Sequence, residues 1–185
     1  MSVGTIKMTA RQFLELGEDP PGVRLELVDG EIAVSPSPIP DHSFVVHALS
    51  RIVGQHIETD DLGQLFGDVD TIFGEHDVRR PDLLFFRKDR LYLIGAKAME
   101  GPPDLAVEVL SPSSVSTDRK HKFKLYASGK VTYYWIVDPR QHTIEAYRLK
   151  AAKYVGRVRG SGTDVVRLPP FLKLDIPLAK LWRPK

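Results

Sequence analysis

Apolar side chains follow one another along residues 103–110, which predicts a strand that is buried on both faces of a sheet. One face of this strand consists of Leu105, Val107 and Val109. The other face consists of Ala106, Glu108 and Leu110. A charge inside a sheet is strongly unfavourable unless a cation, several hydrogen-bond donors or a metal accompanies it. Glu108 is therefore expected to have a partner.

A second carboxylate lies in a similar setting, because Asp82 opens the apolar stretch that continues to Phe86. Pro81 comes directly before it. Two acids on two apolar strands are typical of a metal-dependent active site, since divalent cations of the magnesium type prefer oxygen ligands. Spacing alone is equally compatible with a salt bridge or a turn at either acid.

The remaining pattern predicts alternating helices and strands. Helices are expected at Thr9–Leu16, at Asp41–Ile57 with Asp41 as its N-cap, from Ser116 or Thr117 to Ser128 or Gly129, and at Leu178–Leu181. Strands are expected at Arg24–Val28, Glu31–Val34, Leu65–Phe73, Asp82–Phe86, Leu91–Ile94, Leu105–Leu110, Val131–Val137, Thr143–Leu149 and Lys153–Arg159. This order predicts an α/β or α+β domain over residues 1–185, with helices packed against a mixed sheet.

Two local signals at the N-terminal end are specific. Thr9 and Gln12 have the spacing of a capping box, which indicates the start of a short helix. The dipeptide Asp29-Gly30 separates two alternating segments and is typical of a two-residue hairpin turn. An N-terminal helix followed by a β-hairpin is therefore predicted.

Composition restricts the class of protein. The 185 residues contain 42% apolar and 27% charged side chains, as in a soluble globular domain. The absence of cysteine excludes disulfides, thiol catalysis and cysteine-based zinc sites. No apolar run is long enough to span a bilayer, and the first residues lack the apolar core of a signal peptide, so a cytoplasmic location without membrane contact is expected.

The net charge of +2 hides an uneven distribution. Residues 150–185 hold nine Lys and Arg side chains but only Asp164 and Asp175 as acids, whereas the rest of the chain is net acidic. A basic C-terminal segment is compatible with a polyanionic partner and equally with a solvated surface.

The helix after Glu108 provides a candidate cation. Asp118, Lys122 and Tyr126 follow one another at a spacing of four and therefore share one helical face. That face could lie against the strand that carries Glu108, and the ammonium of Lys122 would then orient an attacking water or stabilise developing negative charge.

In its ordered motifs the chain resembles the Uma-type restriction endonuclease family, long described as a domain of unknown function, within the PD-(D/E)xK nuclease superfamily. The matching segments are Glu26–Glu31, His42 at the head of a helix, Pro81-Asp82, Pro103–Ser113, Asp118 with Lys122 and Tyr126, and Tyr134–Pro139. The resemblance covers nearly the whole chain. It implies a restriction-endonuclease-like core with flanking helices.

The resemblance also implies roles for individual residues. Asp82 and Glu108 would be the metal ligands, and Glu26 would complete the metal shell or bind a water molecule. His42 and Tyr126 would be accessory residues. The implied cofactor is Mg²⁺, with Mn²⁺ as an alternative, and the implied partner is DNA. Because one catalytic centre cuts one strand, cleavage of both strands would favour a homodimer or a higher homo-oligomer.

Two departures from the family pattern affect this interpretation. The superfamily pattern places a lysine two residues after the second acid, but Leu110 stands there, so Lys122 is the natural replacement. The family's usual Gly-Val-x-Glu-Tyr-Trp stretch has Lys130 in place of the glycine and Tyr133 in place of the acid.

Structural roles compete with each catalytic assignment. Glu26 could be a cross-strand pair partner beside Arg24, and His42 could make a local hydrogen bond at the helix start. Lys122 could be a surface lysine, Tyr126 could be a core residue, and Asp118 could be a first-turn acid that favours the helix dipole.

The sequence thus leaves three functions. The first is a Mg²⁺-dependent DNA endonuclease that uses Asp82, Glu108 and Lys122. The second is a nucleic-acid-binding or regulatory protein on the same fold, with weak or no catalysis. The third is a structural oligomer subunit in which Arg79 or Arg80 neutralises the two acids.

Overall fold

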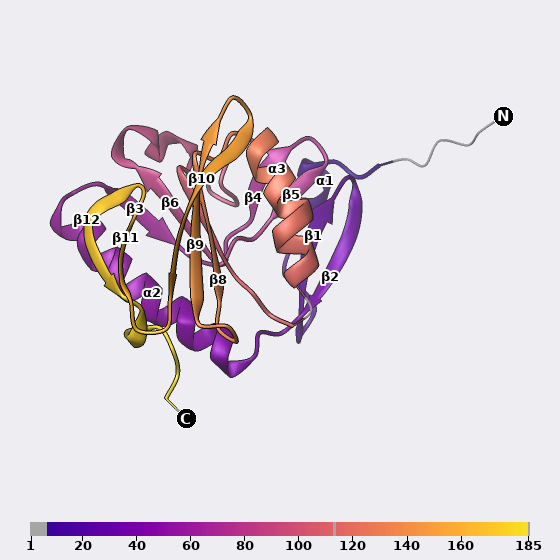
Figure 1. The fold of residues 1–185 in the computed structure, drawn as a ribbon. Coiled ribbons are helices and arrows are strands. Elements are labelled where there is room, and N and C mark those ends of the chain that lie inside the picture. Colours follow the sequence, from indigo (N-terminus) through magenta and orange to yellow (C-terminus); the bar gives the residue numbers. More distant parts are fainter. Residues whose placement is uncertain (1–6, 113, 185) are drawn as a thin grey trace.

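A six-stranded mixed sheet forms the centre of the fold (Figure 1). The computed structural model describes residues 7–112 and 114–184. The strand order is β10-β9-β8-β7-β6-β3, and β7 and β8 run parallel while the other neighbours run antiparallel. The strands are β3 (Gly63–Phe66), β6 (Leu83–Arg87), β7 (Leu105–Val109), β8 (Tyr133–Asp138), β9 (Thr143–Lys150) and β10 (Lys153–Ser161).

A smaller antiparallel sheet with the order β2-β1-β5-β4 lies beside the central one. Its strands are β1 (Val23–Val28), β2 (Glu31–Pro36), β4 (Thr71–Gly74) and β5 (Asp77–Arg79). A third, two-stranded sheet pairs β11 (Val165–Leu168) with β12 (Phe171–Pro177). The helices are α1 (Ala10–Leu14), α2 (Pro40–Thr59), α3 (Phe123–Ser128), the π-helix η2 (Thr117–Lys122), and the 3-10 helices η1 (Lys88–Leu93) and η3 (Leu178–Lys180).

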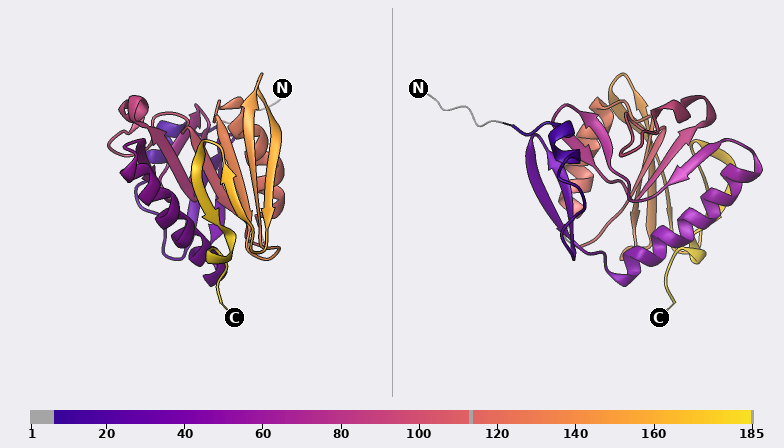
Figure 2. Two further views of the ribbon diagram at one scale, coloured as in Figure 1. Left: turned by 60° about the vertical axis from the view of Figure 1, so that its left-hand side comes forward. Right: turned by 180° about the vertical axis from the view of Figure 1, so that it is seen from behind.

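Helix α2 and helix α3 lie on opposite sides of the central sheet (Figure 2). The apolar face of α2, which includes Leu49 and Val53, packs against the face of β7 that carries Leu105 and Val107. Each fully buried aliphatic side chain of this kind stabilises the fold by about 1.5–3 kcal/mol relative to exposure. This side of the sheet holds the main core.

The other face of β7 meets α3. Ala106 and Leu110 pack there with Tyr126, Tyr134 and Ile136. Because side chains alternate along a strand, Glu108 lies on the same face as Ala106, and it is buried. The predicted division of residues 105–110 between two buried faces is confirmed, and it directs Glu108 toward the helix that carries Lys122.

The N-terminal helix and hairpin also form as predicted. Thr9 and Gln12 form the capping box at the start of α1. Asp29 and Gly30 have φ values of 50° and 81°, as the tight turn between β1 and β2 requires. In Figure 1 the β1–β2 hairpin lies next to α3, so it can form a wall beside the face of Glu108.

Two predicted strands are wrong. The stretch Leu65–Phe73 is divided between β3 and β4, which belong to different sheets, because the chain turns at residues 67–70, where Asp68 has a φ of 56°. Leu91–Ile94 is largely part of the 3-10 helix η1, whose apolar side chains pack against Phe86 and Met99. A short apolar run supports either conformation equally well.

Other boundaries differ from those predicted. Asp41 is not the N-cap of α2, because the cap is Ile39 and Pro40 occupies the first position, where a missing N–H costs nothing. Helix α1 ends at Leu14 rather than Leu16. Strands β5, β11 and β12 were not predicted. Across residues 7–112 and 114–184, no helix combines the length and apolar character needed to cross a membrane.

Candidate active site

A cavity of about 530 Å³ contains most of the candidate residues. Its walls come from the β1–β2 hairpin, the start of α2, the end of β7 and the π-helix η2. Glu26, His42, Asp82, Glu108 and Lys122 all line it. The fold therefore brings together in one space five residues that are widely separated in the sequence.

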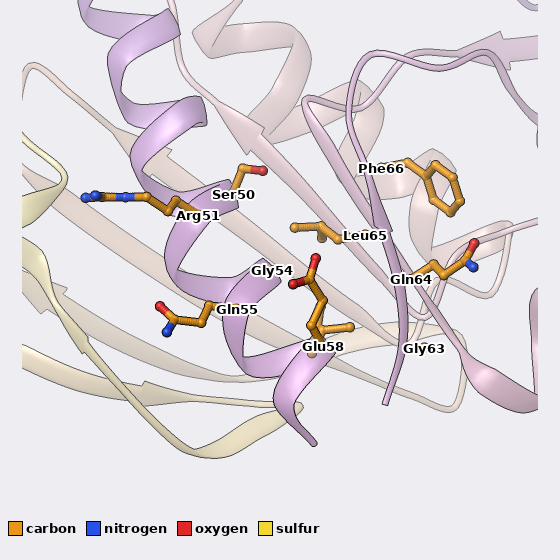
Figure 3. A pocket seen from close by; sticks show the side chains of 10 residues that line it. Ser50, Arg51, Gly54, Gln55, Glu58, Gly63, Gln64, Leu65 and Phe66 are labelled. Carbon is orange, nitrogen blue, oxygen red and sulfur yellow. The ribbon is translucent and has the colours of Figure 1, made fainter. Parts of the chain in front are cut away.

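A second cavity of about 580 Å³ lies between α2 and β3 (Figure 3). Its polar lining includes Ser50, Gln55 and Glu58, and no candidate site residue borders it. We place the chemistry in the first cavity, because the buried ionisable groups gather there.

The ammonium of Lys122 is the centre of the site. Its Nζ lies 3.0 Å from Oε2 of Glu108, 3.6 Å from Oε1 of Glu26 and 3.5 Å from Oδ1 of Asp118. Burial opposes charging of the amine, but the three carboxylates outweigh burial and raise the pKa of Lys122 above its usual value. The residue is 8% exposed, so the prediction that a lysine arrives from the following helix is confirmed, and a surface role is excluded.

Glu108 receives a donor at each carboxylate oxygen. Oε2 accepts from Lys122, and Oε1 accepts a hydrogen bond of 2.6 Å from the hydroxyl of Tyr126. Burial raises the pKa of Glu108 well above its usual value, although Lys122 and Tyr126 act in the opposite direction. Tyr126 is fully buried and combines core packing with this contact to the site.

Asp82 lies close to three nitrogen atoms. Its Oδ2 accepts from the backbone N–H of Val109 at 2.7 Å and lies 3.2 Å from Nε2 of His42, while its Oδ1 lies 3.7 Å from the guanidinium of Arg24. Burial would raise the pKa of Asp82, but His42, Lys122 and the Val109 N–H outweigh it and lower that pKa. The contact of His42 is thus with a residue far away in the sequence, and the expectation of a local bond is wrong.

Glu26 joins the hairpin to the rest of the site. Its Oε1 accepts a hydrogen bond of 2.9 Å from the backbone N–H of Arg80, and Oε2 lies 3.7 Å from Arg79. Glu26 of β1 thus has a cross-strand partner, Arg79 of the paired strand β5, while Arg24 contacts Asp68 and Asp82.

Arg79 and Arg80 do not neutralise the two strand acids. Arg79 pairs with Asp77 and Glu26, and Arg80 pairs with Asp19 and Asp70. The arrangement on which the structural-subunit hypothesis depended is therefore wrong.

Asp118 and Arg24 also line the cavity, although neither was a predicted site residue. Asp118 is 1% exposed, pairs with Lys122, and has its pKa raised by burial. Asp118 stands in the first turn of η2, as expected, but it also takes part in the site through Lys122. Its spacing of four from Lys122 was the available signal. Arg24 stands two residues before Glu26 and therefore on the same face of the strand, which could have indicated that it lies near the site.

The donor set is suited to a hard cation, since its carboxylates are oxygen ligands and already surround an ammonium. Among residues 7–112 and 114–184, no group of three or more acidic or histidine side chains is arranged around one metal position. Magnesium sites commonly use only one or two carboxylates, with water and substrate phosphate as the other ligands. Asp82 and Glu108 meet that smaller requirement.

The central sheet has helices on both faces, and the buried acidic site lies on the face that carries Glu108. A solved structure described as "a putative nuclease belonging to DUF820", from Anabaena variabilis ATCC 29413, superimposes with a TM-score of 0.77. The match covers 95% of this chain and 97% of that chain at 21% identity. The predicted fold class is confirmed.

The family follows from the sequence match. The model of the Uma2 family, described as "Putative restriction endonuclease", matches residues 10–179, so the chain belongs to this family. No curated protein matches the chain. The resemblance found in the ordered motifs is thus confirmed at the level of the family.

Proposed function

We propose that this protein is a Mg²⁺-dependent endonuclease that hydrolyses phosphodiester bonds in DNA. One observation carries the proposal: the ammonium of Lys122 lies 3.0 Å from Glu108 in the cavity that Asp82 also lines. Two carboxylates can hold a divalent cation, and a lysine can stabilise the charge that develops during phosphodiester hydrolysis. The nuclease-type family supports the same reaction class.

Asp82 and Glu108 would hold the ion, with Mn²⁺ as an alternative to Mg²⁺. The bound ion would polarise the scissile phosphate and lower the pKa of a coordinated water molecule. Asp82 suits this role because its lowered pKa keeps it ionised at neutral pH.

Lys122 would supply positive charge beside the reacting phosphate. Its raised pKa keeps the ammonium protonated, so it acts as a fixed charge that orients water or stabilises the pentavalent phosphate, and not as a general base. Glu26 and Asp118 hold the ammonium in place, at 3.6 and 3.5 Å.

Two neighbours would position the catalytic acids, and a third would contact the substrate. His42 fixes the Oδ2 side of Asp82, and Tyr126 fixes Oε1 of Glu108. Arg24, at 3.7 Å from Asp82, is 24% exposed and borders the cavity, so it can turn toward an incoming phosphate.

The proposed substrate has two strands, and one such centre cuts one of them. Cleavage of both strands would therefore favour a homodimer or a higher homo-oligomer with two centres. This assembly is part of the proposal.

The test is cleavage of supercoiled plasmid in Mg²⁺ or Mn²⁺. A concentration of about 5–10 mM is high enough to fill a site that holds its ion weakly. We expect Asp82→Asn and Glu108→Gln to lower the cleavage rate by at least about 100-fold. Asp89→Asn is the matched control, because the side chain of Asp89 is 69% exposed and lies outside the cavity. Equal activity of wild type and both site variants would reject the assignment.

A second function is favoured by one feature of the site: both oxygens of Glu108 already accept from protein donors, Tyr126 and Lys122. A nucleic-acid-binding protein without catalysis would keep such a closed arrangement. It would bind DNA in a salt-sensitive manner with no cleavage in Mg²⁺ or Mn²⁺. Metal-dependent turnover that disappears in Glu108→Gln would exclude it.

A further inference from the structure

Two arginines contact one buried carboxylate outside the cavity, and a third stands opposite it in the sheet. Arg119 of η2 donates to Glu145 of β9 with two nitrogens, at 3.0 and 3.4 Å. Arg157 of β10 lies 3.7 Å from the same carboxylate. Arg159 stands directly opposite Glu145 in the β9–β10 register, so its side chain leaves the same face of the sheet.

Glu145 cannot neutralise this group. It is 4% exposed and also accepts a hydrogen bond from the hydroxyl of Tyr147. Burial would raise the pKa of Glu145, but Arg119 and Tyr147 outweigh it and lower that pKa, so the carboxylate is ionised. One negative charge against three guanidinium groups leaves a surplus of positive charge, and Arg157 and Arg159 are exposed to solvent.

The positive surface continues onto the neighbouring helix. The ring of Phe123, where α3 begins, packs on that of Tyr154 in β10 with centroids 5.0 Å apart, so helix and strand are adjacent. Lys120 and Lys124, on either side of Phe123 in the chain, are exposed. Within residues 7–112 and 114–184, no acidic side chain forms an ion pair with Lys120, Lys124 or Arg159.

Other basic residues of the C-terminal segment are partly neutralised. Arg167 pairs with Asp175 at 2.7 Å, and Arg183 pairs with Asp41 at 2.5 Å. The positive surplus that the sequence places in residues 150–185 is therefore strongest on β10. We call Arg119, Lys120, Lys124, Arg157 and Arg159 the β10 patch.

The β10 patch is continuous with the cavity through η2. His121 and Lys122 of this helix line the cavity, while Arg119 points to β9. A helix with its side chains is about 10–12 Å wide, and one nucleotide advances about 3.4 Å along a strand. One polynucleotide strand can thus contact both places within about three nucleotides.

We infer that the β10 patch binds the phosphate backbone of the nucleic acid whose scissile bond enters the cavity. The inference rests on the proposed function for the identity of that polyanion. Guanidinium groups bind phosphate oxygens through two parallel hydrogen bonds, and the lysines add sequence-independent attraction. The patch therefore positions the substrate without reading its sequence.

The test uses Lys120→Gln/Lys124→Gln/Arg159→Gln in the full chain, because none of these side chains supports a buried contact. Lys97→Gln/Lys173→Gln/Lys180→Gln removes the same charge from exposed positions outside the patch. Binding to a 20-bp duplex and to a single strand of about the same length is followed by fluorescence anisotropy between about 50 and 200 mM salt, without metal. Thermal unfolding confirms that both variants fold.

We expect the patch variant to bind duplex DNA at least tenfold more weakly at 100 mM salt, with its salt slope reduced by about 2–3, since each lost phosphate contact accounts for about 0.9. The control variant should bind with an affinity within about twofold of wild type. Its three lost charges lie outside the patch, and salt screens their effect on the DNA bound there. Loss of single-strand binding alone would identify an unpaired strand as the occupant of the patch.

The outcomes separate this inference from the proposed function. Equal binding by all three proteins, or no binding by wild type, overturns the β10 patch, and the latter result leaves an acidic protein as the candidate partner. Cleavage that depends on Glu108 would still support the endonuclease in the first case. Selective loss of binding together with no cleavage by any protein would support the patch and contradict the endonuclease.

Discussion

The ammonium of Lys122 lies 3.0 Å from Oε2 of Glu108, although the two residues are fourteen positions apart. A lysine two residues after Glu108 would have been on the same face of β7, where Leu110 is instead part of the core with Tyr126. The charge therefore comes from a neighbouring element. The site thus has a lysine beside Glu108, and the strand keeps an apolar side chain at its end.

Replacement of Lys122 tests how far its charge stabilises the fold. In Lys122→Met, the carboxylates of Glu26, Glu108 and Asp118 lose the cation that they share. Breaking a buried ion pair from one side costs about 3–5 kcal/mol, so urea unfolding at pH 7.5 should show a loss of that size. Lys120→Met changes an exposed neighbour and should alter stability by less than about 0.5 kcal/mol.

The loss in Lys122→Met should also depend on pH. Burial already raises the pKa values of Glu108 and Asp118, and removal of the ammonium raises them further. Since the folded state then binds protons more tightly than the unfolded state, stability falls as pH rises above the unfolded values. The difference from wild type should therefore be smaller at pH 5 than at pH 7.5, and a constant difference would contradict this account.

His42 should act by positioning Asp82. The His42 contact is the largest influence that lowers the pKa of Asp82, and it opposes burial. In His42→Leu, burial should prevail and raise that pKa, so the acidic limb of the cleavage pH profile should move to higher pH. His47→Leu, at an exposed position of the same helix, should leave the profile unchanged. A uniform loss of rate without a shift of the acidic limb would indicate only a structural role.

Cation binding should become stronger as pH rises. Glu108 and Asp118 have raised pKa values because of burial, so protons compete with a divalent ion for the site. Binding of Mg²⁺ should then release protons, because carboxylate ligands must be ionised. Titration calorimetry in two buffers with different ionisation enthalpies, at pH 6 and pH 8, measures this release. Equal affinity at both pH values would place the ion away from Glu108.

Regular patterns in the sequence predicted most of the elements that carry the site. The alternation along residues 105–110 gave the faces of β7 and the direction of Glu108, and the spacing of Lys122 and Tyr126 gave their shared helical face. Both depend on local geometry, which a single segment encodes. The Asp29-Gly30 turn was predicted for the same reason.

Contacts between distant segments were not predictable in this way. The pairing of Arg24 with Asp82 depends on how the β1–β2 hairpin sits against the central sheet, and no local pattern records that arrangement. The division of Leu65–Phe73 between two sheets also depends on tertiary packing, because β3 pairs with β6 and β4 pairs with β5. The burial of Asp118 likewise depends on how η2 packs in the fold, which no local pattern records.

The hydroxyl of Tyr126 provides a final test of the site, because it donates to Glu108 Oε1 at 2.6 Å in a fully buried environment. Tyr126→Phe keeps the ring packing but removes the donor from a buried carboxylate oxygen. Such a loss costs about 1–3 kcal/mol, which urea unfolding at pH 7.5 would measure. Tyr92→Phe is the control, since Tyr92 is 76% exposed and should change stability little.

The same variant should respond to pH in a defined direction. The Tyr126 hydrogen bond lowers the pKa of Glu108 against the effect of burial, so its removal should raise that pKa further above the unfolded value. Stability then decreases more steeply than in wild type as pH rises from 5 to 8. In the Glu108→Gln background the added cost of Tyr126→Phe should lose this pH dependence, because the titrating carboxylate is gone. A pH-dependent cost that persists in that background would show that Tyr126 acts through another group.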